Sequence, residues 1–579
     1  MCVYEACDMR ENFLPAETDF GDEVLSGGRV QEILGKQLEE YLGENKVHTT
    51  AYEKERRVKV LETLKAIGED WIRGIADASG VGIHAEAIRI CTFGSYHLGV
   101  DHPESDVDVL ILCPKFVDRQ KDIFGPLDMP GTGEHGKSGI TLVEALRKHP
   151  QVDQLLAVSD AFVPVVKFVL DGIHVDLISA IIPQAEIPTE VDLLSPNSDL
   201  FLKMDSSSRQ GINAMRISRE ILRLVPDEDA FRSTLRAVKL WARRRGIYSN
   251  ILGYLGGISW TIMTAKVCTI YHPSPPAVLL YKFFQLFAMY WDWPRPVVLA
   301  ELASETQSPY LREWNPDLYP SDRRHVMPII TPVHPMMNTT HNVSLSTYRV
   351  IVGELVRGYS CLLSLCAEGI EKSENCRNLW GQLFERTEFF SWYPTYLKID
   401  VSSENTITQT RWKGLVESRL RHLLQMLQNF QFKQVHLCAD ENNATTSNHH
   451  SFYIGIDARN WKGSLENLQK LVTSSVNQWV SEELEWQVRL LSETWEGKES
   501  GRGLGSPVLT RLFSLQFCQR DHATMKITYS MSPGEVAPSR NSTGKRIKRK
   551  QRKAQRHHQA REGDTLNDRE QQHITSVTT

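Results

Sequence analysis

The amino-acid sequence predicts an α+β protein made of several domains. Its 579 residues exceed the usual length of a single domain. An apolar run at 107–112 and an Asp-Gly dipeptide between two apolar runs at 162–178 predict a sheet in the first third of the chain. Helical spacing dominates the middle, and strand patterns alternate with helical ones beyond residue 396. We therefore expect an α/β domain, a helical domain and a second α+β domain, in this order.

The composition excludes several classes of protein. Hydrophobic residues make up 41% and charged residues 24% of the chain, as in ordinary soluble globular proteins. The ten cysteines show no Cys-x-x-Cys pair and no zinc-ligand spacing, which favours reduced thiols in a cytosolic or nuclear protein. Acidic residues and the lack of a long apolar run near the N-terminus argue against a secretory signal. The most apolar stretch, 251–270, is interrupted by Lys266 and two glycines, so we expect a buried helix there and no membrane span.

The chain is expected to begin with a flexible segment, 1–15, followed by two helices. Residues 23–42 and 51–78 carry apolar side chains at helical spacing, for example Val58, Leu61 and Leu64 in the second segment. We expect these helices to pack against a core and to carry no chemistry of their own.

Two carboxylates beside a buried strand form the first candidate site. Asp106 and Asp108 alternate with apolar residues at the start of the run 107–112, and side chains two apart on a strand share a face. Burying two lone carboxylates would be costly, but they suit Mg²⁺, which takes oxygen ligands and often binds substrate phosphates. Upstream, Gly94 and Ser95 form a turn that brings N–H groups and a hydroxyl close to a triphosphate. The alternative is a surface strand with scattered acids.

A hairpin supplies a third carboxylate. Asp-Gly at 171–172 between two apolar runs is a strong hairpin signal, and such a turn places Leu170 opposite Ile173 and Lys167 opposite Asp176. The simpler interpretation is a cross-strand Lys–Asp pair. Together with the first two aspartates, Asp176 instead suggests three acids around two metal ions, with Lys167 available to a phosphate oxygen.

The next two segments are a turn-rich insertion and a long helical pattern. Residues 124–139 contain many glycines and prolines, and we expect a surface insertion. Residues 211–246 are expected to be helical, with Gly246 at the C-terminal cap. Lys239 and Arg243, four residues apart, share a face of this helix, which is either a solvated face or a binding surface.

The C-terminal half alternates strand and helix patterns. A proline-rich segment, 314–347, reads as an extended crossing between two domains. A helix is expected after residue 348, and further helices at 412–429 and 464–484. Strands are expected at 396–401, 434–438, 451–456 and 525–529. This order suits an α+β sandwich whose sheet can offer bases an aromatic or basic platform.

The basic residues of the chain concentrate near its end. The net charge of the whole chain is −5, yet residues 540–561 contain ten Lys or Arg and no Asp or Glu. This segment lacks the apolar residues needed for a core, so we expect disorder. Nuclear import is the favoured role, with phosphate-backbone binding or a merely solvated tail as alternatives.

Three strings of residues resemble a known family. Phe-Gly-Ser-Tyr with Asp-Val-Asp at 93–108, Val-Pro-Val-Val-Lys-Phe with Val-Asp-Leu at 163–177, and Leu-Arg-Ala-Val-Lys-Leu-Trp-Ala-Arg-Arg-Arg-Gly-Ile-Tyr-Ser-Asn at 235–250 are similar to eukaryotic nuclear poly(A) polymerases. These enzymes belong to the DNA polymerase β-like nucleotidyltransferases. The likeness is dense over 16–347 and thinner to about residue 530. It implies template-independent addition of AMP from ATP to an RNA 3′ end, with two Mg²⁺ or Mn²⁺ ions as cofactors.

The resemblance also implies roles for individual residues. The catalytic residues and metal ligands would be Asp106, Asp108 and Asp176, and Asn213 would contact the RNA primer. ATP would be bound by these aspartates and by Phe93, Gly94, Ser95, His102, Lys167, Lys239, Tyr248, Asn250, Gly257 and Ile258. The nuclear localisation signal would consist of Lys545, Arg546, Lys548, Arg549, Lys550, Arg552 and Lys553.

The resemblance divides the chain into five parts. These are a flexible N-terminus (1–15), a nucleotidyltransferase catalytic domain (16–185), a helical central domain (186–347), an RRM-like or ferredoxin-like RNA-binding domain (348–532) and a disordered basic tail (533–579). Expected partners are single-stranded RNA and cleavage and polyadenylation factors. The protein is expected in the nucleus, as a monomer without membrane association.

Some residues depart from the family, and two other functions stay open. His97 stands where the family commonly has arginine, a change that could alter phosphate affinity, and Ile258 replaces a commoner valine. A terminal uridylyltransferase would use the same three carboxylates, because base choice cannot be derived from their spacing. A catalytically inactive RNA-binding scaffold is the other alternative, although every expected catalytic residue is present.

Overall fold

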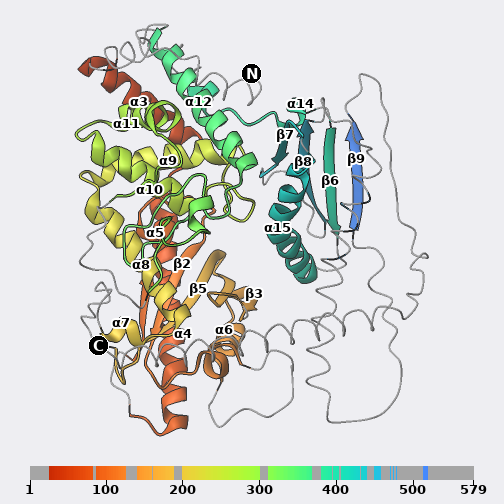
Figure 1. Cartoon of the computed structure of the whole chain (residues 1–579). Coiled ribbons are helices and arrows are strands. Elements are labelled where there is room, and N and C mark those ends of the chain that lie inside the picture. The colour runs from red at the N-terminus through yellow and green to blue at the C-terminus, as the bar shows by residue number, and fades with distance from the viewer. Residues whose placement is uncertain are drawn as a thin grey trace, which may run out of the picture. The chain divides into compact units, whose positions relative to one another are not determined.

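The fold is described from a computed structural model of the whole chain (Figure 1). All described residues belong to one compact unit, which comprises 1–502 and 513–528. The structure describes residues 25, 27–82, 87–125, 140–159, 161–187, 199–299, 311–367, 380–393, 395–402, 406–430, 432–439, 449–457 and 513–519, and single positions at 470, 472, 474 and 478.

A five-stranded sheet forms the centre of the first third of the chain. Its spatial order is β1-β2-β5-β4-β3, with β2 and β5 parallel and the other neighbours antiparallel. The strands are β1 (Arg89–Thr92), β2 (Val107–Cys113), β3 (Val152–Val158), β4 (Val165–Leu170) and β5 (Ile173–Ile181). The expected α/β unit is therefore confirmed, and Figure 1 shows β2 beside β5.

Strand β2 is buried on both faces, which explains its nearly continuous apolar sequence. Its odd-numbered side chains, such as Val109 and Ile111, pack in a core with Leu64 and Trp71 of α4 (Ala51–Ser79). Its even-numbered side chains, Leu110 and Leu112, pack in a second core with Ile212 and Met215 of α8 (Ser206–Leu224). Alternation along the strand therefore places Asp108 on the α8 face of the sheet.

The β4–β5 hairpin has the predicted turn and register. Asp171 and Gly172 both have positive φ, 49° and 73°, as a type I′ turn requires. Leu170 pairs with Ile173, and Lys167 with Asp176.

The two N-terminal helices are α3 (Gly28–Glu44) and α4. Helix α4 begins at a capping box between Thr50 and Glu53 and ends at Gly80, which has φ 65°. Of the expected helix 23–42, the part from Gly28 is confirmed and extends two residues further, whereas Gly27 is its extended N-cap. The apolar pattern assigned to α4 was wrong at Val58, which is 46% exposed, whereas Arg57 is 1% exposed. The buried stripe of α4 thus runs through positions 57, 60, 64, 71 and 75.

The region after the sheet is helical. It contains α7 (Asp199–Lys203), α8, α9 (Glu228–Arg244), α10 (Gly257–Ile270), α11 (Pro276–Gln285) and the π-helix η3 (Leu286–Tyr290). In its core, the fully buried ring of Trp241 meets the rings of Trp260 and Phe284 edge-to-face. None of the described helices is long and apolar enough to cross a membrane.

Two helix predictions in this region need correction. The single helix expected over 211–246 is broken between Leu224 and Glu228, because Pro226 has no N–H to donate and Asp227 caps the N–H groups of Asp229 and Ala230. The buried helix expected from residue 251 begins only at Gly257. Gly246, expected at the C-terminal cap, has φ 66° and directly follows the capping residue, Arg245.

The segment expected to be extended, 314–347, is largely irregular to residue 344, apart from the short 3₁₀ helix η5 (Asp322–Arg324) and isolated bridges, whereas residues 345–347 are helical. Helix α12 (Leu345–Ala367) follows, and a short helix α14 (Phe389–Trp392) precedes the last sheet. Glu354 of α12 forms a buried ion pair with Arg245, with N–O distances of 2.8 and 2.9 Å. This pair joins α12 to the end of α9.

A second sheet, entirely antiparallel, has the order β7-β8-β6-β9. Its strands are β6 (Thr395–Ser402), β7 (Gln434–Leu437), β8 (His449–Asp457) and β9 (Phe513–Gln519), with α15 (Thr406–Gln428) between β6 and β7. Three of the four expected strands are confirmed, and β9 was not expected. The expected strand 525–529, most of the helix 464–484, the N-terminus 1–15 and the basic tail lie outside the described residues.

The ends of the expected insertion 124–139 lie against each other. The π-helix η2 (Arg119–Phe124) ends before Gly125, and a Cβ atom on this glycine would be 2.9 Å from Cγ2 of Thr141. Thr141 in turn caps α6 (Leu142–Lys148) with Glu144 in a capping box. Residues 126–139 themselves lie outside the description.

Candidate active site

The parallel strands β2 and β5 bring two aspartates together. Asp108 on β2 is directly in register with Asp176 on β5. Neighbouring strands lie about 4.8 Å apart, so side chains in register on one face are neighbours. Asp106 lies one residue before β2 and completes the predicted set. The three aspartates thus converge at one edge of the sheet, although Asp176 comes from a segment 68 residues after Asp108.

The carboxylates of the three aspartates favour the binding of a cation between them. Burial, followed by repulsion from Asp176 and Asp106, raises the pKa of Asp108 to about 7. Asp106 is the more exposed residue, yet partial desolvation and Asp176 raise its pKa as well. Burial first, and the neighbouring carboxylates second, thus disfavour the charged forms of Asp106 and Asp108.

Lys167 neutralises part of that charge. Its ammonium forms a hydrogen-bonded ion pair with the carboxylate of Asp176. Over the part of the chain that is described, no group of three or more His, Cys, Asp or Glu side chains is arranged so that it could hold a metal ion as it stands. The donor set nevertheless fits a hard divalent cation, because it consists of carboxylate oxygens whose mutual repulsion such an ion would relieve.

Gly94 provides the closest backbone approach to the aspartates. It has φ 64°, and a Cβ atom at this position would be 2.1 Å from Oδ2 of Asp108. The N–H of Gly94 donates to the Ser218 hydroxyl at 3.1 Å, and the N–H of Phe93 donates to the carbonyl of Asp108 at 3.2 Å. The predicted Gly-Ser turn is in fact the start of a one-turn helix, α5 (Gly94–His97). Only glycine fits here, for conformational and steric reasons.

Gly94→Ala is expected to lower the turnover number at least about tenfold, because the methyl group displaces the Asp108 carboxylate. Gly80→Ala is the matched control. Gly80 has nearly the same positive φ, 65°, but a Cβ atom there has nothing within 4 Å. Both variants should lose about 1–2 kcal/mol of stability from backbone strain, measured by denaturant unfolding. Equal turnover in the two variants would contradict a specific role for the Gly94–Asp108 contact.

A cavity of about 740 Å³ opens beside the aspartates. Nine of the predicted site residues line it, namely Gly94, Ser95, His102, Asp106, Asp108, Lys239, Tyr248, Gly257 and Ile258. The sheet, the helix α9 and the start of α10 thus contribute to one site.

Lys239 is a buried cation of this cavity. It is 7% exposed, and its Nζ donates to the carbonyl of Val100 at 3.2 Å. Burial, followed by the nearby Arg243, lowers the pKa of Lys239 to about 7. An ammonium held at this energetic cost would gain from a bound anion such as a phosphate group.

Tyr248 forms the wall next to Lys239. The guanidinium of Arg243 lies over its ring at 5.0 Å from the centroid. A Cβ atom on Gly257 would be 2.7 Å from the Tyr248 hydroxyl oxygen, so the glycine leaves room for the tyrosine. Lys239 and Arg243 both line the cavity, so the helix face that they share borders it.

Four arginines line the cavity, and none of them was among the residues predicted to bind ATP. Arg236 and Arg243 lie three residues before and four residues after Lys239, so helical spacing could have placed both. Arg244 follows the same pattern less closely. Arg386 comes from a distant segment, and no local pattern indicated it.

Five predicted residues do not line the cavity: Phe93, Lys167, Asp176, Asn213 and Asn250. Asn213 is 8% exposed and its Oδ1 accepts a hydrogen bond from Arg216 at 2.7 Å. The carbonyl of Asn250 accepts from the side chain of Asn342 at 3.1 Å. His97, the departure from the family noted above, also lies outside the cavity wall, next to the Thr92 hydroxyl at 3.4 Å.

Comparisons with known proteins place three family models along the chain. Residues 29–225 match the model described as "Poly(A) polymerase nucleotidyltransferase domain". Residues 230–386 match "Poly(A) polymerase central domain", and residues 388–452 match "Poly(A) polymerase predicted RNA binding domain". Together these matches cover most of the chain.

Curated relatives agree with these models. The chain is 36% identical over 433 residues to "Nuclear poly(A) polymerase 1" of Arabidopsis thaliana, covering 74% of this chain and 57% of that protein. It is 35% identical over 406 residues to "Poly(A) polymerase pla1" of Schizosaccharomyces pombe, covering 68% and 67% respectively. A third relative, "Poly(A) polymerase" of Dictyostelium discoideum, is 37% identical over 400 residues, covering 68% of this chain and 46% of that protein. The chain thus spans about half to two thirds of the length of these relatives.

One solved structure among the matches is more distant than these relatives. The structure titled "Functional implications from the Cid1 poly(U) polymerase crystal structure" shares 15% identity, with a TM-score of 0.39, over 62% of this chain and 99% of that one. Similarity at this level supports no conclusion about substrate.

Proposed function

Because the chain belongs to the poly(A) polymerase family, we propose that it is a template-independent polynucleotide adenylyltransferase, which adds AMP from ATP to RNA 3′ ends. The observation that carries this proposal is the alignment of Asp108 with Asp176, beside a cavity that contains the buried Lys239. An acidic edge for metal ions and a basic wall for phosphates are the two requirements of nucleotidyl transfer.

In the proposed reaction, the 3′ hydroxyl of RNA loses its proton to water, and its oxygen forms a bond to the α-phosphorus of ATP. The bond from that phosphorus to the oxygen bridging the β-phosphate breaks, and pyrophosphate leaves. Asp106, Asp108 and Asp176 would hold two divalent cations, Mg²⁺ or Mn²⁺, which supply charge neutralisation and activation of the attacking hydroxyl. Lys239 would bind a phosphate oxygen, and Tyr248 and Ile258 would bound the space for the nucleoside.

Gly94 and Ser95 contribute by position. The missing side chain of Gly94 lets α5 lie against Asp108, and Ser95 lines the same cavity, where its hydroxyl and N–H would face the triphosphate. Lys167 would keep the Asp176 carboxylate oriented and would be available to a phosphate oxygen. Most of the rate enhancement would come from positioning and charge neutralisation, as in phosphoryl transfer generally.

The proposal includes the division of the chain into a nucleotidyltransferase domain to residue 185, a central domain to 347 and an RNA-binding domain to 532. A nuclear location is supported by the name of one relative, "Nuclear poly(A) polymerase 1", and by the basic cluster at 545–553. Cleavage and polyadenylation factors are the proposed protein partners.

The test is extension of a short single-stranded RNA with each nucleoside triphosphate separately, in Mg²⁺ or Mn²⁺. We expect a growing ladder with ATP alone, measured on a denaturing gel. The double variant Asp106→Ala/Asp108→Ala is the control and should give no ladder. Extension mainly with UTP would replace the proposal by a uridylyltransferase, and binding of RNA without any extension would favour a scaffold.

A further inference from the structure

Loop 98–105 connects the α5 side of the cavity to the aspartates. It begins directly after α5 and ends at Ser105, the residue before Asp106. His102, Glu104 and Ser105 of this loop line the cavity. Whatever fixes the loop therefore fixes part of the cavity and the entry to the metal-binding edge.

Helix α9 holds the first half of the loop. Three basic side chains spaced four and three residues apart, on one face of the helix, each donate to a successive carbonyl. Arg232 Nε donates to Leu98 at 3.0 Å. Arg236 donates to Gly99 at 2.5 Å, and Lys239 to Val100 at 3.2 Å.

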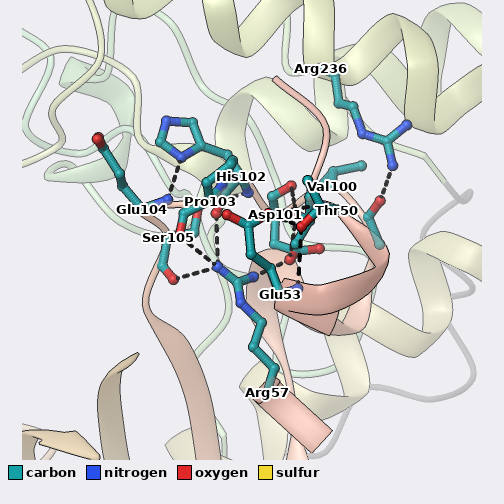
Figure 2. Close-up of polar contacts among 12 residues, drawn as sticks. Thr50, Glu53, Arg57, Val100, Asp101, His102, Pro103, Glu104, Ser105 and Arg236 are labelled. Carbon is teal, nitrogen blue, oxygen red and sulfur yellow. Dashed lines mark hydrogen bonds and ion pairs between the residues drawn. The ribbon is translucent and has the colours of Figure 1, made fainter. Parts of the chain in front are cut away.

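Helix α4 holds the second half through one residue, Arg57. Its Nη1 forms an ion pair with the carboxylate of Asp101. Its Nη2 lies 2.8 Å from the carbonyl of His102, 3.1 Å from that of Ser105 and 3.2 Å from that of Pro103. Figure 2 shows the guanidinium pointing into the concave side of the loop, with dashed lines to these acceptors.

The environment of Arg57 makes these bonds strong and specific. Arg57 is 1% exposed and Asp101 is 7% exposed, so bulk water has little access to them. The Thr49 hydroxyl lies 3.0 Å from both the carbonyl and the carboxylate of Asp101. Within this half of the loop, polar groups also bond to each other, from Ser105 N–H to the His102 carbonyl and from His102 N–H to the Ser105 hydroxyl.

We propose that Arg57 is a positioning residue, which fixes loop 98–105 and through it the position of Asp106 and Asp108. Arg57 does not line the cavity, so it acts through the loop and not on substrate. Its planar guanidinium reaches four acceptors at once, and a lysine ammonium cannot span them. The inference rests on the proposed nucleotidyl transfer, because that reaction gives the aspartates their role.

The test compares Arg57→Lys with two matched variants. Arg56→Lys changes the preceding residue on α4, which contacts Asp171 at the distant hairpin turn. Arg245→Lys changes a similarly buried arginine, which pairs with Glu354 away from the loop. Both variants retain the positive charge, and Arg245→Lys reports how much stability is lost when any buried ion pair is altered.

Two readouts separate positioning from stability. Steady-state kinetics, per folded molecule, should show a turnover number at least about tenfold lower in Arg57→Lys, since displacement of reacting groups by about 1 Å can cost about 10²-fold. The KM for ATP should change less than the turnover number. Amide hydrogen exchange, without metal or nucleotide, should become at least about tenfold faster in loop 98–105 and stay unchanged in the β4–β5 hairpin.

Unchanged exchange in loop 98–105 of Arg57→Lys would overturn the proposal. A lower Tm with normal turnover in Arg57→Lys, which is the result expected for Arg245→Lys, would overturn it as well. If Arg57→Lys does not fold, Asp101→Asn decides, because the Asp101 carboxylate holds the guanidinium in the orientation that reaches the three carbonyls. It should give the same local increase in exchange, and unchanged exchange in this variant would refute the role of Arg57. If the wild-type protein transfers no nucleotide, the proposed function fails, while the exchange measurement still tests the role of Arg57.

Discussion

Asp108→Asn is expected to reduce nucleotidyl transfer by at least about 10³-fold, because the variant loses a charged oxygen ligand at the centre of the reaction. Asparagine has nearly the same shape, so the change in activity reports the charge. The measurement is single-nucleotide extension of RNA under saturating ATP. Asp171→Asn is the matched control, because Asp171 is an exposed aspartate at the β4–β5 turn, outside the cavity. Asp171→Asn should retain full activity.

The substitution Asp108→Asn should also stabilise the metal-free protein near neutral pH. The pKa of Asp108 is about 7 in the folded chain, against an ordinary value of 3.8. Between these values the folded state holds a proton that the unfolded state has lost, so stability decreases as pH rises from about 4 to 7. At about 1.4 kcal/mol per pH unit, the loss is at most about 4 kcal/mol.

The Asp108→Asn variant would lack this pH dependence, so denaturant unfolding in a chelator at about pH 5 and about pH 8 provides the check. The difference in stability between the two pH values should be smaller in Asp108→Asn than in the wild-type protein. An identical pH dependence in the two proteins would mean that the raised pKa of Asp108 is not the cause of the loss of stability. Retained activity in Asp108→Asn would instead show that Asp108 is not one of the metal ligands.

Lys239→Met is expected to lower kcat/KM for ATP by about 10²-fold or more, since the variant lacks the buried ammonium expected to bind a phosphate oxygen. Methionine has a similar volume, and removing a costly buried charge should leave the fold intact or slightly more stable. Calorimetric titration with ATP and the metal ion measures the loss of affinity directly. Lys266→Met on α10 is the control, because Lys266 is partly buried but lies outside the cavity. Equal effects of the two substitutions would contradict a specific phosphate contact.

The local parts of the fold could be predicted from the sequence. The β4–β5 hairpin has the expected turn and register, because Asp171 and Gly172 can adopt positive φ and the flanking apolar runs allow only this pairing of the two strands. The break at Pro226 was also a local signal, but continuous amphipathic spacing on both sides concealed it. Strand β9 was not expected, because its pairing with β6 joins segments more than 100 residues apart.

The site was predictable in part. The three aspartates and Lys239 were predicted from short motifs and a family resemblance, whereas the parallel pairing of β2 with β5 is a property of the folded sheet. Arg57 was hidden because it is a charged residue in a helix rich in exposed charges. Its position on the buried stripe of α4, three residues before Val60 and seven before Leu64, is the signal that could have revealed it.

The contact between Gly125 and Thr141 bears on how this protein can change over evolution. The two ends of the intervening segment already meet, and Thr141 starts α6 with its own cap. Closing a longer loop between fixed ends costs only about 0.6 kcal/mol for each doubling of its length. Residues can therefore be gained or lost between 126 and 139 without moving the sheet, which makes this point a natural place for lineage-specific sequence and for an inserted reporter tag.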